Sequence, residues 1–135
     1  MGQQQLLLII LGVIIVGIAI AVGISMFSSG SVQANKDAIV NDMNNLAANA
    51  YQHRIRPCSM GGGAGSYTGT ACTPANPWTV PTKLVTTENG TYARTNAAQA
   101  VTITGTSASY PSSTVVAVVD STGKLGSWTY TGDFL

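Results

Sequence analysis

The stretch Leu6–Phe27 reads LLLIILGVIIVGIAIAVGISMF, and its 22 residues are apolar except for Gly12, Gly17, Gly23 and Ser25. As an α-helix rising about 1.5 Å per residue, it would span roughly 33 Å, enough to cross a bilayer core about 30 Å thick. Apolar residues occupy every face of such a helix, so no polar side would meet water. We therefore expect this segment to lie in lipid or against copies of itself.

Charge is scarce along the whole chain. Charged residues make up 8% of the 135 residues, and the formal net charge is +1. Nucleic-acid binding needs several cations lined up against phosphates. The six Lys and Arg residues form no such cluster, so the composition predicts no nucleic-acid partner.

A second helical pattern follows the apolar segment, and Ser28–Ser31 is a point where the first helix could end, kink or continue. Apolar residues recur at helical spacing while polar residues fill the other faces. They are Ile39, Met43, Leu46, Ala47 and Ala50, with Ile55 near the end. Pro57 should stop this helix, and Arg54 and Arg56 are favourably placed near its negative C-terminal end. We expect the apolar stripe to pack in a core.

Two cysteines, Cys58 and Cys72, lie 14 positions apart across a stretch rich in Gly, Ser and Thr. Beyond a membrane-targeting segment the compartment is expected to be oxidising, which favours an intrachain disulfide. The alternative is two free thiols in a reduced protein. Metal ligation is disfavoured, because the single histidine, His53, has no second Cys or His pair beside it.

Beyond a loop at Ser59–Trp78 the pattern changes to strands. Asn89-Gly90 lies between two runs rich in Thr, Val and Tyr within Lys83–Thr95, a strong hairpin signal. Further strands are predicted at Gln99–Thr104, Thr114–Val119 and Leu125–Thr131. Val115–Val119 is apolar on both faces, which places it in the middle of the sheet. Asn89-Gly90-Thr91 also fits the N-glycosylation pattern, but Asn-Gly is the turn chemistry that a hairpin needs, and we favour the turn.

These elements predict an α+β fold in which an antiparallel meander of about four strands packs on the amphipathic helix. The predicted parts are an apolar membrane or filament-core helix at residues 1–30, an amphipathic helix at 31–57 and a globular β domain with a disulfide loop at 58–135.

This order of elements resembles that of the type IV pilins and related filament subunits. Members of that family begin with a hydrophobic residue, carry a glutamate at the fifth position and continue into a long apolar helix. The second half of that helix packs on an antiparallel sheet, and many members have a disulfide-bounded region. With Met1 as the mature start, Gln5 falls on the glutamate position. The chain departs from the family in this Gln and in lacking a helix-kinking proline near Val22-Gly23.

The resemblance implies roles for particular residues. Met1 would be the processed and N-methylated terminus, and Gln5 would form a polar contact between subunits. Packing in the filament core would fall to Leu6, Ile10, Gly12, Ile15, Gly17 and Gly23. Amide hydrogen bonds from Gln3, Gln4 and Gln5 would satisfy buried polar groups without burying a charge. Alternatively, these glutamines lie in a lipid headgroup layer.

The expected function is therefore that of a structural subunit of an extracellular, type IV pilus-like filament. Its partners would be copies of itself, the inner membrane before assembly and the pilus assembly machinery, and its location the cell surface. One alternative is a pseudopilin of a secretion system. Another is a single-span or signal-bearing envelope protein, with Val32-Gln33-Ala34 before Asn35 as a signal-peptidase site.

An enzyme is the least expected class. The carboxylates are scattered without a paired spacing, and no nucleophile motif surrounds any serine. We expect no cofactor and no metal, and we interpret His53 as a surface or interface residue.

Overall fold

The computed structural model describes residues 2–135, and Met1, the predicted processing site, lies outside the described residues. The chain divides into two compact units, Met1–Ala34 and Asn35–Leu135, which we call unit 1 and unit 2. Helix α1 spans Gly2–Ile55, so it supplies the described part of unit 1 and the first residues of unit 2. The helix continues through Ser28–Ser31 and ends just before Pro57, as the missing N–H of proline requires.

The part of α1 within unit 2 is amphipathic in the way the sequence predicts. Its buried residues are Ile39, Met43, Leu46, Ala47 and Ala50. The prediction that Ile55 extends this stripe is wrong, because Ile55 is 57% exposed. At about 100° per residue, Ile55 lies some 160° around the helix from Ile39. Its side chain therefore points away from the core.

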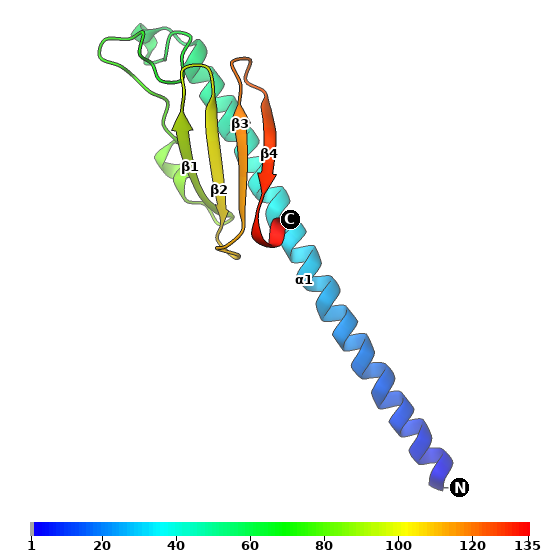
Figure 1. The fold of residues 1–135 in the computed structure, drawn as a ribbon. Coiled ribbons are helices and arrows are strands. Elements are labelled where there is room, and N and C mark those ends of the chain that lie inside the picture. Colours follow the sequence, from blue (N-terminus) through cyan, green and yellow to red (C-terminus); the bar gives the residue numbers. More distant parts are fainter. Residues whose placement is uncertain (1) are drawn as a thin grey trace. The chain divides into compact units, whose positions relative to one another are not determined.

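The sheet of unit 2 contains four antiparallel strands in the order β1-β2-β3-β4 (Figure 1), which confirms the predicted meander and the α+β class. The strands are β1 (Gly90–Asn96), β2 (Val101–Ser107), β3 (Thr114–Val119) and β4 (Leu125–Tyr130). Residue pairs in register include Arg94 with Ile103 and Thr104 with Val116. As predicted, β3 is an interior strand. The pairing of β3 with β4 is irregular between Val116 and Val118.

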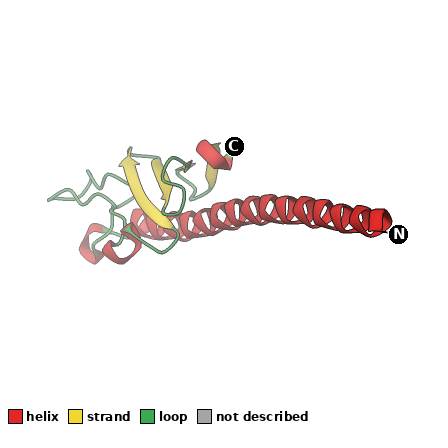
Figure 2. Ribbon diagram, turned by 90° about the horizontal axis from the view of Figure 1, so that it is seen from below, coloured by secondary structure: helices red, strands yellow, loops and turns green. Residues whose placement is uncertain are grey.

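Within unit 2, one face of the sheet packs on α1, which Figure 2 shows on one side of the strands. The inward residues of β2 and β3 alternate with half-exposed ones, and Val101, Ile103, Val115, Ala117 and Val119 are fully buried. At Gly105 a β-carbon would come within 2.8 Å of Ile39 Cγ2. The absence of a side chain there lets β2 lie close to the helix.

The chain reverses direction next to Asn89-Gly90, but one residue earlier than predicted, because the turn is centred on Glu88 and Asn89 and Gly90 is already the first residue of β1. The strand predicted before the turn does not form. Residues Thr82–Val85 form one turn of helix, α2, and only Thr86 pairs with β1, through an isolated bridge to Thr91. The backbone N–H of Thr87 donates to the Gly90 carbonyl at 2.8 Å. A β-carbon at Gly90 would lie 2.1 Å from the Thr106 carbonyl oxygen, so a larger residue would not fit.

Cys58 and Cys72 are joined by a disulfide, as predicted. Cys58 lies in the short 3₁₀ helix η1 (Cys58–Met60). A second 3₁₀ helix, η2 (Gly132–Phe134), follows β4. The loop from η1 to α2 is anchored more deeply than its Gly-rich composition indicates. Tyr67 is fully buried and Trp78 is 2% exposed. The Tyr67 hydroxyl donates to the Asp120 carbonyl at 2.6 Å.

Candidate assembly surface and polar pocket

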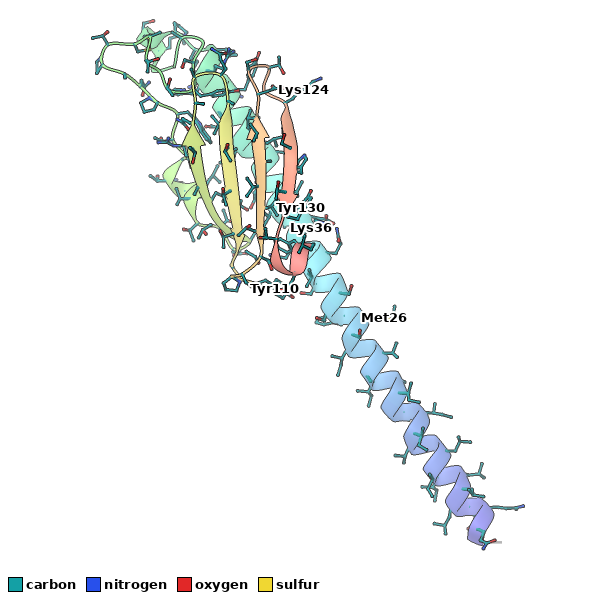
Figure 3. The ribbon with its side chains drawn as sticks, viewed as in Figure 1. Met26, Lys36, Tyr110, Lys124 and Tyr130 are labelled. Carbon is teal, nitrogen blue, oxygen red and sulfur yellow. A yellow bond between two sulfur atoms is a disulfide. The ribbon has the colours of Figure 1, made fainter. Side chains whose placement is uncertain are left out.

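The apolar segment Leu6–Phe27 is helical throughout, and every large hydrophobic residue in it is between 52% and 80% exposed. The predicted packing residues Leu6, Ile10 and Ile15 are 60%, 54% and 58% exposed. Figure 3 shows the side chains, including Met26, projecting outward around this part of α1. The helix is long and apolar enough to cross a membrane, although a signal sequence near the N-terminus would meet the same criterion.

The glycines of the apolar segment leave gaps on the helix surface. A β-carbon at Gly12, Gly17 or Gly23 would meet nothing within 4 Å. Gly12, Gly23 and Gly30 fall within about 20° of one another around the helix, because 11 and 18 residues complete nearly whole turns. Gly17 lies about 140° from Gly12 and therefore on another face. The helix continues through all of these glycines without a break.

Gln5 lies in the first turns of α1 and is exposed. Its neighbours Gln3 and Gln4 are exposed as well. The described residues of unit 1 are therefore an apolar helix surface preceded by three amides and no charge.

A polar pocket lies in unit 2, where the last turns of α1 meet the disulfide loop. Its volume is about 260 Å³, and it is open to solvent. Its lining includes Asn49, Gln52, His53, Arg56, Asn76 and Trp78. Trp78 Nε1 donates to Asn49 Oδ1 at 2.9 Å, and Asn76 Nδ2 donates to the Gly61 carbonyl at 2.8 Å. Asn49 thus keeps its amide N–H groups for another partner.

His53 lies between this pocket and the Gly-rich part of the loop. Its Nδ1 is buried and has no hydrogen-bond partner among the described residues. Burial, and then the positive charge of Arg56, lower the pKa of His53. The imidazole is therefore neutral near pH 7, and His53 is half-buried in the wall of the polar pocket.

A carboxylate network fixes the opposite end of unit 2. Asp42 Oδ2 on α1 accepts hydrogen bonds from the Tyr92 hydroxyl at 2.6 Å and Asn89 Nδ2 at 3.0 Å. Burial, and then the hydrogen bond with Asp42, raise the pKa of the Tyr92 phenol. Because the Asn89 amide nitrogen is bonded to Asp42, the turn interpretation of Asn89-Gly90-Thr91 gains support over glycosylation.

The sequence patterns do not indicate the polar pocket as a whole. Asn49, Gln52, His53 and Arg56 follow the spacing i, i+3, i+4, i+7, which places them on one helix face. That spacing was a usable signal for a polar helix face near the C-terminal end of α1. The contribution of Asn76 depends on the fold of the disulfide loop, and no local pattern indicates it.

Within residues 2–135, no group of three or more His, Cys, Asp or Glu side chains is arranged to hold a metal ion. In comparisons with known proteins, no protein-family model, no curated protein and no solved structure matches this chain.

Proposed function

We propose that this protein is the structural subunit of an extracellular filament of the type IV pilus kind, assembled through its apolar segment Leu6–Phe27. Two observations carry the proposal: that segment is exposed along its length, and unit 2 is folded and disulfide-bonded. Such a helix needs an apolar environment on all sides. Lipid supplies that environment before assembly, and copies of the same helix supply it in a filament.

The free energy involved is large. If each helix buries on the order of 1,000–2,000 Å² of apolar surface, the gain is tens of kcal/mol at roughly 25 cal/mol per Å², before entropic costs. The gaps at Gly12 and Gly23 support close approach of neighbouring helices on one face. Gln5 would then supply amide hydrogen bonds between subunits without the desolvation cost of a buried carboxylate.

Gln5 also bears on the choice between a pilus subunit and a pseudopilin, because the resembled pseudopilins usually keep an acid at this position. The pilus subunit is therefore the preferred assignment. A single-span envelope protein remains the second candidate, and its supporting observation is that α1 is long and apolar enough to cross a membrane by itself.

Intact mass measured on protein released from the cell surface by shearing separates these functions. We expect a mass that includes Leu6–Phe27, together with polymers that sediment. A mass beginning at Asn35 would mean cleavage after Ala34 and would overturn the proposal, as would a full-length protein found only as a monomer in the membrane.

A further inference from the structure

The two ends of unit 2 carry different chemistry. At one end, Asn35 Nδ2 donates to the Asn89 carbonyl at 3.4 Å, so the start of this unit lies beside turn 87–90. We call this the Asn35 end. At the other, the Arg56 end, the last turn of α1 meets the disulfide loop and the polar pocket. Arg56 directly follows the end of α1, 21 positions after Asn35, which corresponds to roughly 31 Å at the helical rise per residue.

The polar pocket at the Arg56 end has a cation without an anion. Arg56 is exposed and lines the pocket, and no carboxylate is among the described residues that line it. The neighbouring Arg54 is occupied differently, because its guanidinium donates to Gln99 Oε1 at 2.7 Å. Arg56 is therefore the cation that this pocket presents to an incoming group.

The remaining pocket groups suit a carboxylate. Asn49 presents amide N–H donors because its oxygen is bonded to Trp78. Gln52 adds a second amide at the rim. A guanidinium flanked by amide donors can bind the two oxygens of one carboxylate, the geometry in which arginine is most effective.

The Asn35 end presents a carboxylate on a rigid support. Glu88 is exposed within turn 87–90. The turn is closed by the hydrogen bond from Thr87 to Gly90 and is tied to α1 through Asn89 and Asp42. Because its backbone is held at both sides, Glu88 loses little freedom when it binds a partner.

We propose that the polar pocket of one copy receives Glu88 of the next copy, joining unit 2 domains end to end. Within one copy turn 87–90 is tied to α1 at Asn35 and Asp42, which precede Arg56 by roughly 31 and 21 Å of chain at helical rise. Only a second copy can therefore bring Glu88 into the pocket. Such a contact joins two different surfaces head to tail, and where the rotation between copies does not close into a ring it builds an open polymer. This inference rests on the proposed filament function and adds a contact that sets the axial order of the subunits.

The Glu88 contact would determine the arrangement of the subunits more than it would stabilise the polymer. An exposed ion pair contributes little on its own and is screened by salt. The apolar helices would drive polymerisation, whereas the Glu88 contact, present once per subunit, would select one axial register. We therefore expect its loss to lower polymer yield by about fivefold at low salt, and by less at 1 M salt, where the Debye length is about 3 Å.

The test is a charge swap in the full chain. Arg56→Glu and Glu88→Arg each should lower the yield of sedimentable filaments, and the double variant should restore it. Lys124→Glu is the matched control, because Lys124 is an exposed cation in a turn outside the polar pocket, and it should leave the yield unchanged. Thermal melting and disulfide mapping of each variant establish that unit 2 is folded.

A second measurement identifies the contact itself. In filaments of Arg56→Lys, a carbodiimide should join the new lysine to Glu88, giving a crosslinked peptide that is absent from dissociated subunits. Filaments without this crosslink, together with single charge variants that assemble like the parent, would overturn the inference and leave the filament function standing. Absence of filaments from the parent chain would instead refute the proposed function.

Discussion

Replacing Ile15 by aspartate tests whether the apolar segment holds the assembly together. Ile15 is 58% exposed in the single chain. Full burial of an isoleucine side chain stabilises by about 1.5–3 kcal/mol. Burying the part of Ile15 that is still exposed would therefore contribute about 1–2 kcal/mol. An unpaired carboxylate, or its forced protonation, adds roughly 3 kcal/mol at the centre of an apolar layer.

The sum is about 4–5 kcal/mol per subunit, and each 1.4 kcal/mol changes an association constant by a factor of ten. We therefore expect the subunit concentration needed for filament formation to rise by roughly a thousandfold in Ile15→Asp. Under cellular conditions this means no filaments. Ile15→Leu is the matched control and should assemble normally, because volume-conserving apolar exchanges cost less than about 1.5 kcal/mol.

The assay counts filaments by electron microscopy and measures the melting temperature of the released protein. Unit 2 should melt at the parental temperature in both variants, since Ile15 belongs to unit 1. A chain expressed from Ser31 onward should likewise fold, form its disulfide and remain monomeric. Normal filaments from Ile15→Asp, or filaments built from the shortened chain, would refute this reasoning.

Three further changes probe unit 2. Asp42→Ala should lower the free energy of unfolding by about 1–3 kcal/mol, because it leaves the buried Tyr92 hydroxyl without its acceptor. Adding Tyr92→Phe should recover part of this loss. Losses of the two single variants that simply add in the double variant, measured by denaturant titration, would contradict the coupling. In the parent, the free energy of unfolding should fall as the pH drops below about 6.5, because the pKa of His53 is lowered in the folded chain and the unfolded chain therefore binds the proton first. His53→Gln should remove this fall, and parallel pH–stability curves for parent and variant would exclude the effect. Removing the disulfide by Cys58→Ser with Cys72→Ser should cost about 3 kcal/mol and increase hydrogen exchange mainly in the loop, whereas equal exchange increases in the strands would argue against a local effect.

The sequence predicts the core of unit 2 well where periodicity is strong. The stripe from Ile39 to Ala50 is buried as expected, because a helix packed on one sheet face needs one apolar side. Val115–Val119 lies in an interior strand, and the disulfide pairs the only two cysteines. Each of these features is encoded locally or by elimination, so little tertiary information is required.

The errors occur where tertiary contacts override local preference. Thr82–Val85 is helical although it contains β-formers. Leu84 lines a small cleft together with Leu46 of α1, a tertiary contact that no local pattern indicates. No sequence periodicity predicts the burial of Tyr67 and Trp78, because each is a single aromatic residue in an irregular loop. The polar pocket needs both that loop and α1, so only its helical half could be predicted from spacing.

Helical reconstruction from electron micrographs of surface filaments, labelled with antibody to this protein, tests the central proposal most directly. We expect labelled filaments whose density places Leu6–Phe27 of many copies side by side in a central bundle, surrounded by unit 2. Cells that produce the protein without labelled filaments, or labelled filaments whose core lacks these helices, would contradict the account.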